Sequence, residues 1–119
     1  MYFIEKVEIP ESVFSIETQA FYGCSSLQSI TIKSKTIFIG NMAFWGCGNL
    51  QTIYYLGINQ PSYNSNNGCP DYTYGCNSFS CSPFSCSCNS LTTVYVLSTY
   101  QDQEDSFCGK DVSVQPISI

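Results

Sequence analysis

The stretch AFWGCGNLQTIYY, Ala43 to Tyr55, has a near copy 23 positions upstream, AFYGCSSLQSITI, Ala20 to Ile32. An aromatic residue, a glycine, a cysteine, a leucine and an isoleucine keep their places in both copies. Self-similarity at a fixed period is typical of repeat architectures. A unit of this length is too small to enclose a core alone, whereas stacked units bury a continuous one. The two stretches therefore predict a solenoid with a period of 23 positions.

Each unit ends in the pattern of a strand with one buried face. Ile30 and Ile32 alternate with Ser29, Thr31 and Lys33, and β-branched residues dominate, as strands prefer. The same L-x-x-I-x-I form occurs four times, at 4–9, 27–32, 50–55 and 91–96. We therefore expect a mainly parallel β solenoid.

The rest of the unit predicts short connections. A second apolar piece occupies 13–16 and recurs at 37–39. Ala20 and Phe21 suit a single helical turn that directs the phenylalanine inward. Gly23 and Gly46 occupy the return turn, where a left-handed backbone favours glycine.

The period divides a single domain, residues 1–119, into three parts. Regular repeats cover 4–56. Residues 57–87 are interpreted as a cysteine-rich irregular insertion, because Gly, Pro, Asn and Ser crowd there and such composition is typical of turns. Residues 88–119 are expected to form the last strand and an acidic C-terminal cap.

Composition excludes several classes of function. The chain has no His and no Arg, four Lys, and a net charge of −5. Without His, no Ser–His or Cys–His nucleophile pair exists within the chain, and no basic patch is present for a nucleic acid. No motif for a catalytic residue, a cofactor or a metal stands out, so we expect no enzyme. Neither a signal peptide nor a membrane span is evident.

The eight cysteines leave alternatives open. Cys24 and Cys47 stand in register and are interpreted as small buried core residues, with a disulfide between them as the lesser alternative. For the others, disulfides, free thiols and a zinc site are all considered, although the spacing of zinc ligands is not matched. These are Cys69, Cys76, Cys81, Cys86, Cys88 and Cys108.

The repeated form I-P-x-S-V-x-x-I followed by A-F-x-G-C-x-x-L resembles the BspA-like leucine-rich repeats. It covers residues 4–55 and resumes at 88–109, although Pro10 is not echoed after Ile32 and 57–87 breaks the period. The resemblance implies a leucine-rich-repeat solenoid and the C-terminal portion of a longer array. It also implies a non-catalytic surface or secreted protein that binds host matrix or cell-surface proteins. The alternatives are an intracellular structural or interaction repeat, a repeat fragment without its own ligand, and a cysteine-rich metal-binding module.

Outward-facing strand positions form two columns along the predicted sheet. Leucine-rich repeats usually bind on this face, so the second column is the candidate binding face, with Tyr54 and Tyr95 as aromatic anchors. The alternative is that Tyr and Thr are simply good strand residues. An uncovered first strand would also favour self-association. The columns are Lys6, Ser29, Thr52 and Thr93, and Glu8, Thr31, Tyr54 and Tyr95.

Overall fold

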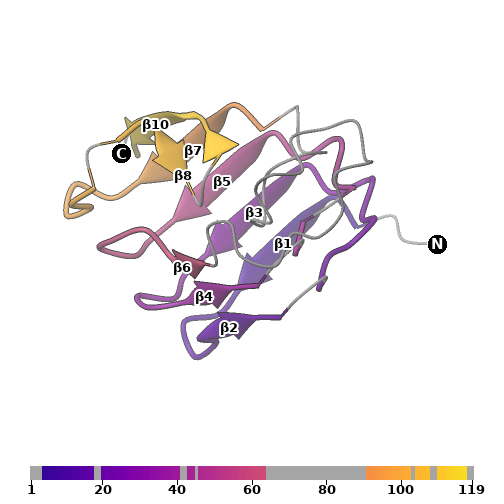
Figure 1. Ribbon diagram of the computed structural model, residues 1–119, viewed down its shortest axis with the longest axis horizontal. Coiled ribbons are helices and arrows are strands. Elements are labelled where there is room, and N and C mark those ends of the chain that lie inside the picture. Colours follow the sequence, from indigo (N-terminus) through magenta and orange to yellow (C-terminus); the bar gives the residue numbers. More distant parts are fainter. Residues whose placement is uncertain are drawn as a thin grey trace.

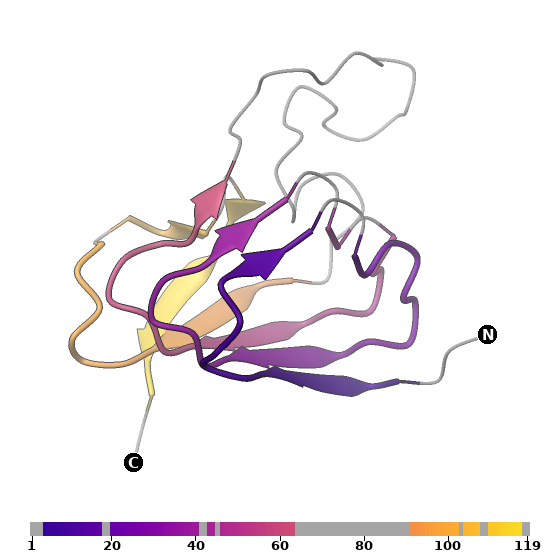
Figure 2. The ribbon, with the colours of Figure 1, turned by 90° about the horizontal axis from the view of Figure 1, so that it is seen from below.

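The computed structural model describes residues 4–17, 20–40, 43–44, 46–63, 91–102, 104–107 and 110–117. Two parallel sheets form its two layers (Figures 1 and 2). Lys6 lies opposite Ser29, and Ser29 lies opposite Thr52, so the first three rungs keep the predicted period. The predicted leucine-rich-repeat solenoid is therefore confirmed.

The larger sheet has five parallel strands. Its order is β1 (Lys6–Ile9), β3 (Ser29–Ile32), β5 (Thr52–Tyr55), β7 (Thr93–Val96) and β10 (Ser113–Pro116). The first four are the four predicted segments. β10 lies in the part expected to be a cap, and it adds a fifth strand beside β7.

The smaller sheet contains β2 (Ser15–Ile16), β4 (Phe38–Ile39) and β6 (Ser62–Tyr63). β2 and β4 correspond to the second apolar piece of the repeat. β6 falls inside the segment interpreted as an insertion from residue 57, and it pairs with β4. The third rung therefore continues to at least Tyr63. A short antiparallel pair, β8 (Ser106–Phe107) and β9 (Lys110–Asp111), precedes β10.

The core lies between the two sheets. Inward residues of the long strands meet those of β2 and β4, and one leucine from each of three rungs fills the bend before the strand. The residues that are at most 1% exposed include Leu27, Ile30, Ile32, Ile39, Leu50, Ile53, Tyr55, Leu91 and Val94. Because side chains alternate along each strand, these apolar residues face the core and the residues between them form a polar outer surface.

The predicted helical turn is wrong, because none of the described residues is helical. Hydrogen-bonded turns replace it: the Ala20 N–H donates to the Glu17 carbonyl and the Cys24 N–H to the Phe21 carbonyl, each at 3.1 Å. Phe21 is half-buried, and its ring stacks on that of the fully buried Phe44, with centroids 5.2 Å apart and planes 5° apart. The expected inward position of this phenylalanine is thus reached without a helix.

Both return-turn glycines have the predicted positive φ, 75° at Gly23 and 85° at Gly46. They also stack on each other. A Cβ built on Gly46 would lie 3.1 Å from both the Cα and the N of Gly23. Position 46 therefore requires glycine, both because its φ is positive and because the backbone of the preceding rung lies so close.

An aromatic cluster joins the third rung to the C-terminal strands. The buried Tyr55 ring packs edge-on against Tyr100 and Phe107, with centroids 6.0 Å and 5.3 Å apart. The Tyr55 hydroxyl donates to the Asn59 carbonyl at 2.6 Å. These contacts hold β7 directly beside β5, although the two strands are far apart in the sequence.

Candidate functional site

The candidate binding face is assembled as the repeat register predicts. Glu8 lies opposite Thr31, Thr31 opposite Tyr54, and Tyr54 opposite Tyr95. The neighbouring column of Lys6, Ser29, Thr52 and Thr93 is also in register. β10 extends both columns, with Gln115 opposite Tyr95 and Ser113 opposite Thr93. One continuous outer face therefore runs across five strands.

Tyr54 and Tyr95 form a stacked pair. Their ring centroids are 5.2 Å apart and their planes differ by 15°. Parallel strands are about 4.8 Å apart, so this stack follows directly from adjacent β5 and β7. The sequence allows a spacing of two rungs between the tyrosines if the irregular segment contributes a strand of its own, or of one rung if it does not. β5 pairs directly with β7, so the spacing is one rung.

The two rings differ in exposure. Tyr54 is 38% exposed, whereas Tyr95 is half-buried. The expectation that both side chains face water therefore holds for Tyr54 and only in part for Tyr95. Tyr95 supports the Tyr54 ring from one side, and Thr31 is the small residue on its other side.

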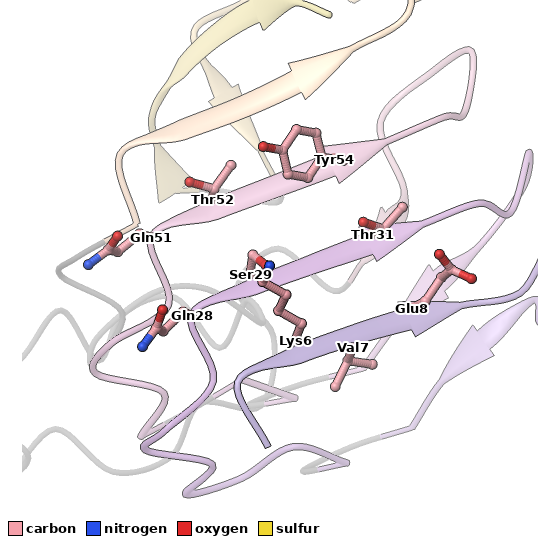
Figure 3. Close-up of a pocket in the computed structure, with 9 residues that line it drawn as sticks. All are labelled: Lys6, Val7, Glu8, Gln28, Ser29, Thr31, Gln51, Thr52 and Tyr54. Atoms are coloured by element: carbon pink, nitrogen blue, oxygen red, sulfur yellow. The ribbon is translucent and has the colours of Figure 1, made fainter. Parts of the chain in front are cut away.

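A shallow hollow of about 440 Å³ lies on this face (Figure 3). The hollow exists because the middle of both columns carries small side chains, those of Ser29, Thr31 and Thr52. The longer side chains of β1 border it on one side, and the Tyr54 ring of β5 borders it on the other. Hydroxyl and amide groups dominate its lining. The lining residues are Lys6, Val7, Glu8, Gln28, Ser29, Thr31, Gln51, Thr52 and Tyr54.

Gln28 and Gln51 were not predicted as site residues. They lie immediately before β3 and β5, at the same position of successive repeats, and they line one end of the hollow (Figure 3). The signal was present in the sequence, since both follow the repeated leucine. Their amides can both donate and accept hydrogen bonds, which suits a polar ligand group or a peptide backbone.

The candidate binding face carries few charges. Glu8 makes an ion pair with Lys33 at 3.1 Å, and both side chains are well exposed, so the pair itself contributes little to stability. Lys6 adds one positive charge in the neighbouring column. Among the residues that the structure describes on this face, no cluster of cations forms.

The cysteine predictions are resolved only in part. Cys24 and Cys47 are thiols and not a disulfide. Cys47 is buried, and its Sγ donates to the Phe21 carbonyl at 3.2 Å, whereas Cys24 is half-buried against the core. Their predicted role as small buried core residues is therefore confirmed for Cys47 and holds only in part for Cys24. The predictions for Cys69, Cys76, Cys81, Cys86, Cys88 and Cys108 lie outside the described residues.

Within the described ranges, no group of three or more acidic or cysteine side chains is placed to hold a metal ion. Those ranges also contain no helix that is long and apolar enough to cross a membrane.

The family assignment follows from the repeats. The family model for the BspA-type leucine-rich repeat region matches residues 2–112 in six copies. The chain therefore belongs to the BspA-type leucine-rich-repeat family. No curated protein and no solved structure matches it.

Membership supports a general role as a protein-interaction repeat module. Repeats of this family are generally non-catalytic, and proteins that carry them are typically at the cell surface or secreted.

Proposed function

We propose that the chain is a non-catalytic adhesion module of the cell surface that binds an extended segment of a protein partner across the candidate binding face. The stacked Tyr54–Tyr95 pair beside the hollow carries this proposal. A tyrosine ring held flat by a second ring presents contact area at low cost in side-chain entropy. Rigid aromatic anchors of this kind are enriched among the residues that dominate binding energy.

The shape of the hollow suits a ring from the partner. Tyr95 covers one side of the Tyr54 ring, while Thr31 leaves room on the other. A third ring seated over Thr31 would continue the stack at the spacing of the strands. An aromatic side chain of the partner is therefore the proposed central contact.

The polar lining suits the partner's backbone. Hydroxyl and amide groups that are buried without hydrogen bonds cost free energy. A peptide carries a donor and an acceptor at nearly every residue, so it satisfies the Gln28 and Gln51 amides and the neighbouring hydroxyls. A purely apolar ligand would leave them unsatisfied.

Charge argues against a polyanionic ligand. The described cations near the face are Lys6 and Lys33, and Lys33 is paired with Glu8. Nucleic acids and sulfated sugars require several uncompensated cations for binding. A host matrix or cell-surface protein is therefore the proposed partner class.

The test measures binding of purified matrix proteins to the immobilised chain. The double variant Tyr54→Ser, Tyr95→Ser is expected to lose about 2 kcal/mol of binding free energy or more. The control is Phe14→Ser, Phe38→Ser, because Phe14 is 75% exposed beside β2 and Phe38 is 36% exposed in β4, in the other sheet. Equal binding by wild type and the tyrosine variant would contradict the proposed face.

A separate measurement tests the location. Residue-resolved disulfide mapping of the native protein distinguishes a surface protein from an intracellular repeat, because persistent disulfides form in oxidising compartments. Fully reduced cysteines would favour the intracellular alternative.

A further inference from the structure

The stacked tyrosines of the candidate binding face are also placed to react with each other. Tyr54 and Tyr95 are register partners on the adjacent parallel strands β5 and β7, and their nearly parallel rings have centroids 5.2 Å apart. Side chains that leave opposed positions of parallel strands point the same way. The two hydroxyl groups therefore lie at the same end of the stack, which brings the ortho carbons beside them close together.

This arrangement suits the oxidative coupling of two phenols. Loss of one electron and of the hydroxyl proton gives a phenoxyl radical, whose unpaired electron is shared between the oxygen and the ortho carbons. Two such radicals form a carbon–carbon bond between their ortho carbons. The hydrogen on each of these carbons then moves to the phenolic oxygen, which restores both aromatic rings and both hydroxyl groups. Rings already held side by side couple far faster than rings that must first meet by diffusion.

The pair is accessible to an oxidant in solution. Tyr54 is 38% exposed and Tyr95 is half-buried. A second pair of tyrosines, Tyr55 and Tyr100, is 1% and 7% exposed, and its rings meet edge-on and not as a stack. Access and ring geometry therefore both favour reaction at Tyr54 and Tyr95.

The neighbours of the pair favour coupling within it. Thr31 lies opposite Tyr54 on the side away from Tyr95, and Gln115 lies opposite Tyr95 on the side away from Tyr54. Hydroxyl and amide side chains give up an electron far less readily than a phenol, so a radical on either ring has one phenol beside it in this column. Thr31 is also small, which leaves room for the Tyr54 ring to turn as the bond forms.

We propose that Tyr54 and Tyr95 are an oxidative modification site, at which hydrogen peroxide and a one-electron peroxidase form a dityrosine cross-link within the chain. The two phenols together lose two electrons and two protons, and one hydrogen peroxide accepts them and leaves as two waters. The new bond joins β5 to β7 and closes the chain between them into a loop. A closed loop restricts the unfolded chain, as a disulfide does, and so stabilises the fold. The reaction needs no bound partner, so it is independent of the proposed binding function.

Peroxidase treatment of the dilute full chain tests the site. With a haem peroxidase and an equimolar amount of hydrogen peroxide, the chain should acquire dityrosine fluorescence and still run as a monomer on a reducing, denaturing gel. Peptide mass spectrometry should find the Tyr54 peptide joined to the Tyr95 peptide, with the loss of two hydrogen atoms. The yield should not change with protein concentration, because the reaction is intramolecular.

Conservative variants show which phenols react. Tyr54→Phe and Tyr95→Phe each keep a ring in the stack but lack the hydroxyl group, so each should lose this cross-linked peptide. Tyr22→Phe is the matched control, because Tyr22 is 49% exposed in a turn outside the sheets, and this variant should retain the cross-link. Far-UV circular dichroism checks that each variant is folded.

Two results would overturn the proposal. One is a treated wild-type chain that yields no joined Tyr54 and Tyr95 peptides. The other is coupling of Tyr54 mainly to a different tyrosine or to a second copy of the chain, which would show that the stack does not direct the reaction.

Discussion

Replacing Gly46 by alanine tests how closely successive rungs approach each other. Both return-turn glycines have positive φ, so alanine at either Gly23 or Gly46 carries the strain of a left-handed backbone. They differ in what the new methyl group would meet. At Gly23 nothing lies within 4 Å, whereas at Gly46 the backbone Cα and N of Gly23 lie at 3.1 Å.

The two costs can be estimated separately. Left-handed backbone costs an L-residue with a Cβ about 1–2 kcal/mol, so Gly23→Ala should lower the free energy of unfolding by about that amount. Gly46→Ala adds a contact with backbone that cannot rotate away. Overpacking of this kind typically costs about 1–3 kcal/mol further. We therefore expect a total of about 2–5 kcal/mol for Gly46→Ala, which is a large share of the stability of a domain this size.

Urea unfolding followed by circular dichroism measures the difference. Gly48→Ala is the matched control, since Gly48 has neither positive φ nor a neighbour within 4 Å of a new Cβ. That variant should be unchanged or more stable by up to about 1 kcal/mol. Equal losses for Gly23→Ala and Gly46→Ala would refute the argument that the two glycines stack.

Three further substitutions test the core and the contacts between rungs, each by the same unfolding measurement. Phe44→Ala removes a fully buried, stacked ring and should cost about 3–5 kcal/mol; an unchanged midpoint would show that the repeat register does not mark the core. Gly57→Ala would place a methyl group into the Tyr55 ring and should cost about 1–3 kcal/mol. In a Tyr55→Val background, which lacks the ring, Gly57→Ala should cost clearly less than it does in the wild type, and an equal cost in both backgrounds would argue against the clash. Ser34→Ala removes a buried hydroxyl whose single hydrogen lies within reach of both the Pro10 and the Val13 carbonyl oxygens, and it should cost about 1–2 kcal/mol, whereas a neutral result would contradict its role in joining the first two rungs.

The sequence contained the register of the candidate binding face. A shift of one repeat period aligns Glu8 with Thr31 and Thr31 with Tyr54, and parallel strands preserve that alignment in space. Tyr95 lies well over one period beyond Tyr54, so its place beside Tyr54 depends on Leu91-x-x-Val94-x-Val96 repeating the form of the earlier strands. The period predicts this register because every rung must direct alternate side chains into the core.

Two strands of the parallel sheets, β6 and β10, were not predicted because they depart from the period. Ser62, the partner of Phe38, lies one position later than the period predicts, so β6 is out of phase with the repeat, and it follows a proline. Ser113, the partner of Thr93, comes earlier than the period predicts, so a fixed shift does not reveal β10. Hydrogen bonding between neighbouring backbones tolerates such changes in loop length, whereas a fixed sequence shift does not.

The hollow could not be predicted from pattern alone. It depends on the difference in size between Tyr54 and the small residues beside it, and on the stacking that positions the ring. Neither follows from alternation, which specifies that a residue points outward but not what it touches.

Hydroxyl-radical footprinting of the complex with a captured partner tests whether the partner binds over Tyr54. Among the described residues, exposed aromatic side chains lie on different surfaces: Tyr54 on the candidate binding face, Tyr22 in a turn, and Phe14 and Phe38 on the side of the smaller sheet. Bound partner should strongly reduce oxidation of Tyr54 and leave Tyr22, Phe14 and Phe38 as reactive as in the free chain. Protection of Phe14 and Phe38 with Tyr54 unchanged would contradict binding over Tyr54.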